Sequence, residues 1–212
     1  MTEREVKENW KRHWTKGASL EENATWVGAR LRKQRLIITQ KMLEPIDKTL
    51  KTIDLGCGGG RTLAVLRDCG FKDSIGIDYV IESLERCEQK GFVINKDVFL
   101  VDAKQTPYEN REFGLVFSEG LWEHFKQPEP FIKEAARIAD KYIMIIQPDH
   151  FTFVGFLMKI GWIIFSRNKG GVKEYSFRLE YFEDELKKYG FKLIDKGRTQ
   201  FKEQAVLLFE RE

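Results

Sequence analysis

A glycine-rich segment is the feature of the sequence that most directly indicates a ligand-binding loop. Four glycines fall within positions 56–60, directly after the apolar run Thr52-Ile53-Asp54-Leu55. Glycines there let the backbone turn tightly and let a ligand approach the main chain closely. The dinucleotide fingerprint G-x-G-x-x-G is incomplete, because Arg61 stands where its last glycine belongs, and the phosphate loop G-x-x-x-x-G-K-[ST] is absent. Asp54 would repel a pyrophosphate, so the segment favours a positively charged ligand such as an ammonium or sulfonium compound.

Further segments follow in a recognisable order. Ile75-Gly76-Ile77-Asp78 and Val101-Asp102-Ala103 each place a carboxylate after a short apolar run. The passage from Thr106-Pro107-Tyr108 through Phe113-Gly114-Leu115-Val116 to Leu121-Trp122-Glu123-His124 comes next. Together with Asp-Leu-Gly-Cys-Gly-Gly-Gly at positions 54–60, these segments resemble the class I S-adenosylmethionine (SAM) methyltransferases, in their small-molecule, type 11 branch. The resemblance covers about residues 50–147.

The resemblance implies SAM as cofactor and S-adenosylhomocysteine (SAH) as its product. In the family's pattern, Asp78 would accept hydrogen bonds from both ribose hydroxyls, and Asp102 would accept one from the adenine amino group. Gly114 replaces the family's usual aspartate, a position that supports the loop, so the change affects local strand geometry rather than cofactor binding. The expected cofactor-binding residues are Asp54, Gly56, Cys57, Gly58, Gly60, Asp78, Tyr79, Asp102, Ala103, Ser118 and Glu119.

Candidate catalytic residues lie after the fourth and fifth apolar runs, where ligands bind in open α/β sheets. Methyl transfer from a sulfonium mainly needs the acceptor held in line, and a general base is needed only when the acceptor must lose a proton. The candidates are His124, Glu119 and His150, with Glu123 beside them. Each also has a structural interpretation. His124 would pack or cap a helix, Glu119 would be exposed or lie at the cofactor's amino-acid end, and His150 would belong to a helix cap.

No metal site is expected, because the three histidines are far apart and lack cysteine or acidic neighbours at ligand spacing. Segment 118–121 also lacks the Asn/Asp-Pro-Pro-aromatic pattern that grips exocyclic amines of bases or glutamine side chains. The net charge of +3 is mild for a nucleic-acid binder. We therefore expect a small-molecule methyl acceptor as the partner and no nucleic acid, with the oligomeric state left open.

Short apolar runs alternate with amphipathic segments from residue 50 onward. Strands are predicted at 51–55, 74–78, 97–101, 113–118, 142–147, 191–196 and 204–209, and helices at 62–69, 81–90, 121–125, 129–139 and 180–189. Strands separated by helices imply parallel pairing, whereas the last two runs are too close for a crossover and must pair antiparallel. The predicted fold is an α/β, Rossmann-like doubly wound sheet of about seven strands. It is mostly parallel, with one reversed strand near the C-terminal end and an N-terminal helical cap.

The predicted domain organisation is an N-terminal helical cap at 1–45, broken at 16–19, and a SAM-binding methyltransferase domain at 46–212. An apolar insertion at about 150–178 contains the stretch 151–165, which is apolar nearly all round, unlike a surface helix. This stretch would pack beneath the N-terminal helices, form a lid over an apolar acceptor, or rest on a membrane surface. It is shorter than the ~20 residues that span a bilayer, so no transmembrane segment is expected.

The cysteines and the N-terminal residues indicate the cellular compartment in which the protein is expected. Three cysteines cannot pair completely, and the first ten residues are charged where a signal peptide needs an apolar region. We expect a cytoplasmic protein with free thiols. A composition of 42% hydrophobic and 33% charged residues excludes a disordered chain.

The sequence therefore predicts an enzyme, a SAM-dependent methyltransferase acting on a small, partly apolar acceptor. The alternative is a non-catalytic SAM-binding or partner-regulating module on the same fold, because fold does not fix function. A nicotinamide-dependent oxidoreductase is a third and weaker reading, against which Asp54 and Arg61 argue.

Overall fold

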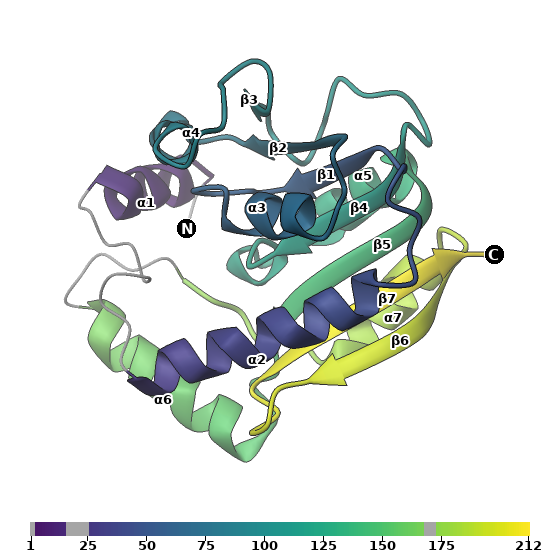
Figure 1. Ribbon diagram of the computed structural model, residues 1–212. Coiled ribbons are helices and arrows are strands. Elements are labelled where there is room, and N and C mark those ends of the chain that lie inside the picture. The colour runs from purple at the N-terminus through teal and green to yellow at the C-terminus, as the bar shows by residue number, and fades with distance from the viewer. Residues whose placement is uncertain (1–2, 16–25, 168–172) are drawn as a thin grey trace.

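The computed structural model describes residues 3–15, 26–167 and 173–212, and its centre is a seven-stranded sheet with helices on both faces (Figure 1). The strands are β1 (Thr52–Leu55), β2 (Ser74–Asp78), β3 (Val98–Leu100), β4 (Phe113–Glu119), β5 (Ala139–Pro148), β6 (Phe191–Arg198) and β7 (Gln204–Arg211). The helices are α1 (Glu3–Thr15), α2 (Trp26–Leu43), α3 (Arg61–Asp68), α4 (Ile81–Glu88), the short 3-10 helix η1 (Trp122–His124), α5 (Glu129–Ile138), α6 (Phe153–Arg167) and α7 (Leu179–Lys187).

The strand order is β3-β2-β1-β4-β5-β7-β6. Strands β1 to β5 pair in parallel, and β7 pairs antiparallel with both β5 and β6. The reversed strand is therefore β7, one place in from the sheet edge. The predicted fold class is confirmed, including the antiparallel final hairpin that the short link between the last two apolar runs required.

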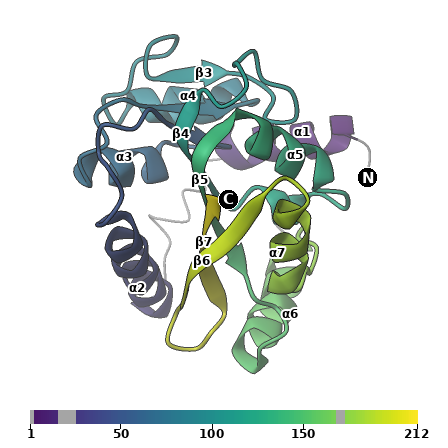
Figure 2. The same ribbon diagram turned by 90° about the vertical axis from the view of Figure 1, so that its right-hand side faces the viewer.

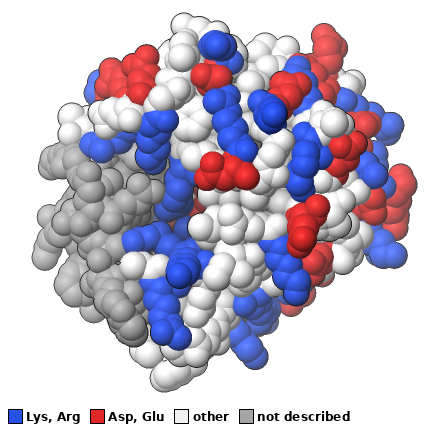
Figure 3. Space-filling model, viewed as in Figure 1, with Lys and Arg blue, Asp and Glu red and all other residues white. Residues whose placement is uncertain are grey.

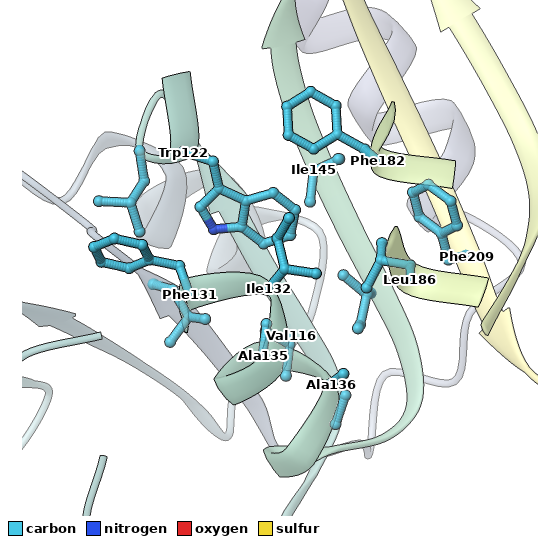
Figure 4. Packing of buried hydrophobic residues seen from close by; sticks show 14 of the residues in the cluster. Val116, Trp122, Phe131, Ile132, Ala135, Ala136, Ile145, Phe182, Leu186 and Phe209 are labelled. Carbon is cyan, nitrogen blue, oxygen red and sulfur yellow. The ribbon is translucent and has the colours of Figure 1, made fainter. Parts of the chain in front are cut away.

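Side chains of the central strands alternate between two cores, one on each face of the sheet. Val116 and Ile145 belong to the core that contains Trp122, together with residues of α5 and α7 (Figure 4). Phe117 and Met144 belong to the opposite core, beneath α2 and α3 (Figure 2). Because both faces are covered, these strands are apolar on both sides, which explains their continuous hydrophobic runs.

Most predicted boundaries agree within two residues, and the two largest differences lie at β5 and η1. Strand β5 begins at Ala139, three residues before the predicted start, because α5 ends at Ile138 and the chain enters the sheet directly. The helix predicted at 121–125 is a single turn of 3-10 helix, η1. The short η1 keeps Glu123 and His124 close to the end of β4.

Gly114 alters the strand locally, as its departure from the family pattern predicted. The pairing of β4 with β5 shifts register between Phe113 and Leu115. A Cβ atom at Gly114 would lie 2.6 Å from Cδ2 of Leu50. Glycine therefore lets Leu50 pack against this strand, where any larger residue would collide with it.

The two N-terminal helices occupy different places. α2 lies along the β6–β7 side of the sheet, and its Met42 and Leu43 are buried in the core there (Figure 1). α1 lies on α4, where Lys11 pairs with Glu82 at 3.1 Å. The break predicted at 16–19 lies outside the described residues. The helix α2 is thus part of the layer that covers the sheet, whereas α1 lies beside the ligand-binding edge.

Helix α6 follows β5 and projects at the lower edge of the molecule (Figure 1). In its described first half, Phe153, Phe156 and Leu157 are exposed. The interpretation that this stretch packs beneath the N-terminal helices is therefore wrong for these side chains. Among the described residues, every helix is too short or too polar to cross a bilayer.

Candidate functional site

The glycine loop turns sharply from β1 into α3. Gly56, Gly58 and Gly60 all have positive φ angles, of 72°, 51° and 75°, which side chains adopt only with strain. A Cβ at Gly60 would lie 3.0 Å from Sγ of Cys87 and a Cβ at Gly56 would lie 3.0 Å from Leu121. The glycines are therefore required by both backbone angle and close packing, and they leave the main chain open along one side.

Asp54 lies at the end of β1 and is 1% exposed. Neither carboxylate oxygen has a hydrogen-bond partner among the described residues. Burial raises the pKa of this carboxyl well above its usual range, and the charge of Glu119 adds to the rise. An unpartnered buried carboxylate is costly, and a cation bound close above it would lower that cost. Its environment therefore fits a ligand with an ammonium or sulfonium group.

Asp78 ends β2 and faces the same loop. Its two oxygens accept hydrogen bonds from the amides of Gly58 (3.0 Å) and Val80 (2.9 Å). Burial raises the pKa of this carboxyl to about 6, and these amides partly oppose the rise. The carboxylate is thus held in one position and keeps lone pairs for further donors, as two ribose hydroxyls would require.

Two adjoining cavities follow the carboxyl ends of the strands. One, of about 420 Å³, is bordered by the glycine loop, and the other, of about 430 Å³, contains Asp102 and Ala103. They share Gly56, Asp78, Tyr79 and Leu121. Three acids therefore mark one elongated site, with Asp54 beneath its first part, Asp78 in the middle and Asp102 at the far end. Cys57 lines the first cavity, whereas Asp54 and Gly60 lie behind the residues that line it.

Helix α1 closes one side of the first cavity. Its Trp14 packs on the glycine loop, where a Cβ at Gly58 would lie 2.8 Å from the indole. The Trp14 carbonyl accepts two hydrogen bonds from Arg86, at 2.9 and 3.1 Å. Trp10 meets the ring of His124 edge to face, with centroids 4.8 Å apart. Both tryptophans line the cavity.

Glu119 is held by three partners. Its carboxylate lies 2.7 Å from the guanidinium of Arg35 and 2.6 Å from that of Arg61, and it accepts a hydrogen bond of 2.6 Å from Thr62. These cations hold the pKa of Glu119 below its usual range, against the effect of burial. A carboxylate with these partners is a weak proton acceptor, so the geometry favours a structural role for Glu119 over a catalytic one. Its contacts connect β4 with α2 and α3 beside the glycine loop.

This arrangement predicts a large stability effect. Replacing Glu119 by alanine should lower the free energy of unfolding by about 3–5 kcal/mol, because it leaves Arg35 charged and buried without its partner. The matched control is Glu183→Ala, which removes a partly exposed pair with Lys196 and should cost less than about 1 kcal/mol. Urea denaturation of both variants measures the difference. Equal losses of unfolding free energy in the two variants would contradict the structural role assigned to Glu119.

Ser118 has a structural position. Its hydroxyl donates 3.1 Å to the carbonyl of Leu55, linking β4 to β1, and it is fully buried. It borders neither cavity, in contrast to its neighbour Glu119. Its contribution to a cofactor site is therefore to fix the strand on which the loop depends.

His124 and Glu123 lie on η1 and border the first cavity. Nδ1 of His124 is 3.0 Å from the carbonyl oxygen of Lys173, which can only accept, so Nδ1 carries the proton and Nε2 keeps its lone pair. Burial lowers the pKa of His124, so the ring is neutral near pH 7. Burial, with the nearby charge of Glu174, raises the pKa of Glu123 to about 8. A neutral imidazole and a protonated carboxyl thus stand side by side.

His150 lies one step further from the cavity. Its Nδ1 is 3.1 Å from the hydroxyl of Ser176, and its Nε2 is 3.5 Å from Glu174. Glu174 borders the cavity, whereas His150 does not. The irregular segment 173–178 brings Glu174 there, and its Tyr175 amide donates 2.6 Å to the carbonyl of Glu123. No motif surrounds Glu174, so the sequence contained no signal for it.

In the described part of the chain, no group of three His, Cys, Asp or Glu side chains is arranged to hold a metal ion. Cys57, Cys69 and Cys87 are free thiols.

The strand order, the glycine loop after β1 and the acids that end β1 and β2 define the class I SAM-dependent methyltransferase fold. Residues 53–142 match the methyltransferase domain family of type 11. The predicted resemblance to the class I methyltransferases of this branch is thus confirmed over residues 53–142.

Known relatives extend the comparison. A curated relative, 2-methyl-6-phytyl-1,4-hydroquinone methyltransferase 2 of Oryza sativa subsp. japonica chloroplasts, is 28% identical, with 71% of this chain and 42% of that protein covered. The chain thus spans about two fifths of that relative's length. A chain from the complex of the Haloferax volcanii Trm112 methyltransferase activator with a methyltransferase superposes with a TM-score of 0.72 at 13% identity, covering 95% and 97% of the two chains. Magnesium protoporphyrin IX methyltransferase from Synechocystis PCC 6803, with bound SAH, gives 0.71 at 19% identity, covering 97% and 94%.

Proposed function

We propose that the protein is an enzyme that transfers the methyl group of SAM to a small, partly apolar acceptor with an acidic hydroxyl group. The observation that carries the proposal is the elongated double cavity, lined by Asp78 and Asp102 and with Asp54 buried behind the glycine loop. Asp54, Asp78 and Asp102 follow one another as the charged amino-acid end, the ribose and the adenine of SAM would. The Synechocystis relative was solved with SAH bound, which supports this choice of ligand.

The binding part of the proposal uses the chain's own groups. SAM supplies a methyl group already activated by its sulfonium. The open main chain of the glycine loop, above Asp54, holds the charged end, and Asp78 accepts the ribose hydroxyls. Tyr79 and Ala103 border the cavity in which the adenine would lie, beside Asp102. Asp102 is about half exposed and 3.6 Å from Lys104, so its hydrogen bond to the adenine would be the weakest of the three contacts.

The acceptor part rests on the remaining wall of the first cavity. Trp10, Leu121 and Ile146 are apolar, whereas His124 and Glu123 can exchange protons. Such a wall fits a molecule with an apolar ring and a hydroxyl, and the hydroquinone named for the curated relative is of this class. We propose that Nε2 of His124 takes the hydroxyl proton and that Glu123, protonated, donates a hydrogen bond to the acceptor.

Ligand binding and turnover test the proposal separately. Saturating SAH should raise the melting temperature by about 5–10 °C, the shift expected for a ligand at ~100 times its dissociation constant in a chain of this size. NADH is the control and should give no shift. Radiolabelled methyl transfer to simple phenols and hydroquinones then separates an enzyme from a non-catalytic SAM-binding module. A shift with SAH but no labelled product from any acceptor, including cell extracts, would favour the module.

A further inference from the structure

Helix α6 is apolar around most of its circumference, and one of its apolar stripes is exposed. Phe153, Phe156, Leu157 and Ile160 follow the spacing i, i+3, i+4, i+7 and form one stripe of the helix, here called the α6 stripe. Their side chains are 79%, 54%, 49% and 39% exposed. In a surface helix of a water-soluble protein such a stripe faces the core. Here it faces away from the protein.

The opposite side of α6 is the one fixed to the protein. A Cβ at Gly155 would lie 1.9 Å from the carbonyl oxygen of Asp149, so only glycine allows this close approach. One turn later, Lys159 donates a hydrogen bond to Ser176. The glycine and the lysine are therefore on the inner side, and this attachment holds the α6 stripe outward.

The exposed apolar surface continues beyond the helix. Phe151 and Phe201 are 53% and 45% exposed, and Phe201 lies on the turn between β6 and β7. Thr152, just before α6, donates 3.2 Å to the carbonyl of Lys202 on that turn, so the turn and the start of α6 adjoin. Contiguous exposed apolar surface of this kind marks an interaction site.

The charge around this surface is positive. Between Phe151 and Ile160 the sequence contains no Asp or Glu, and its one charged residue, Lys159, lies on the inner side of α6. The exposed Arg178 lies 4.7 Å above the ring of Phe151, and Lys202 is exposed on the adjoining turn. Lys and Arg also gather around the N-terminal half of α2, at the lower left of Figure 3, and α2 meets the same turn where the Gln200 amide donates to Gln34. An apolar stripe with cations around it is complementary to an anionic lipid surface.

We propose that α6 binds the surface of an anionic membrane, with the α6 stripe inserted between the lipids and the surrounding cations at the headgroups. The helix has 15 residues, so it lies in the interface rather than crossing the bilayer. The chain that leaves α6 returns at Lys173 and Glu174 to the wall of the first cavity. The proposal rests on the stripe and its charges, and it stands whether or not the proposed methyl transfer is correct.

Vesicle sedimentation tests the proposal with the intact chain. The wild type should bind phosphatidylcholine vesicles that contain about one third phosphatidylglycerol, and binding to pure phosphatidylcholine or in high salt should be several-fold weaker. The variant Phe153→Ser with Leu157→Ser should bind the anionic vesicles at least tenfold more weakly. The matched control, Val93→Ser with Ile194→Thr, removes two comparably exposed apolar side chains that belong neither to α6 nor to the adjoining turn, and should bind like the wild type.

Other results would overturn the proposal. The proposal is excluded if the wild-type protein does not bind anionic vesicles. It is also excluded if the stripe variant binds them as strongly as the wild type does. Dimeric wild type that becomes monomeric in the stripe variant, without vesicle binding, would instead assign the stripe to a second copy of the chain. Near-ultraviolet circular dichroism confirms that the variants are folded, and Phe156→Ser with Ile160→Ser replaces the first variant if that one unfolds.

Discussion

Replacing Asp78 with alanine should weaken SAH binding at least a hundredfold. The carboxylate is held by the amides of Gly58 and Val80 and lies where the two cavities meet. Two hydrogen bonds from ribose hydroxyls to a charged, buried acceptor contribute about 1.5–3 kcal/mol each, and the variant loses both. Isothermal titration with SAH measures the loss.

The pH dependence of binding adds a second check on Asp78. Burial raises the pKa of this carboxyl to about 6, and the hydroxyl groups need its ionised form. SAH affinity of the wild type should therefore be constant above pH 7 and fall as the pH drops through 6. The Asp78→Ala variant should lack this fall. Asp184→Ala, on the exposed side of α7, is the control and should bind SAH as the wild type does. An unchanged affinity in Asp78→Ala would remove this residue from the site.

Replacing His124 with glutamine should lower kcat by about 10²–10³-fold, the usual contribution of a positioned general base. His124 borders the acceptor cavity, and the Lys173 carbonyl fixes the tautomer in which the Nε2 lone pair is available. SAH affinity should stay within about threefold of the wild type, because the proposed part of His124 concerns the acceptor and not the cofactor. A fall in SAH affinity with unchanged kcat would show that His124 only supports the fold.

The pH profile distinguishes His124 from Glu123. As pH rises, kcat should increase while His124 loses its proton, below its ordinary value near 6.5 because burial lowers its pKa. It should decline again near pH 8, where Glu123 ionises and ceases to donate. Glu123→Gln keeps a neutral donor, so it should retain most activity at pH 7 and lose the decline at high pH. A hundredfold loss at pH 7 would instead make Glu123 the base.

Glu123→Gln should also change stability with pH. The folded-state pKa of Glu123, about 8, exceeds its ordinary value of 4.5, so the unfolded chain releases its proton first as pH rises. The wild type should therefore lose stability between about pH 5 and 8, and the variant should lose less. Thermal melts at both ends of this range give the comparison.

Helix α6 shows how the tertiary structure narrows an interpretation that the sequence left open. From the sequence, the apolar stretch 151–165 could belong to the core, form a lid or rest on a membrane surface. An apolar pattern shows that these side chains avoid water, but it does not show what they pack against. The contacts of Gly155 and Lys159 decide which side is inward. They remove the core interpretation for the first half of α6 and leave its apolar stripe exposed.

The sequence by itself determined the elements and the identity of the binding loop. Period, spacing and glycine positions are local properties, so they predicted seven strands, the reversed β7, and the acids Asp54 and Asp78 at strand ends. Tertiary structure decided the electrostatic state of the candidates. Arg35 reaches Glu119 from α2, the Lys173 carbonyl selects the tautomer of His124, and burial with Glu174 keeps Glu123 protonated. These partners are distant in the chain, and a pKa depends on burial and neighbouring charge, which no local pattern contains.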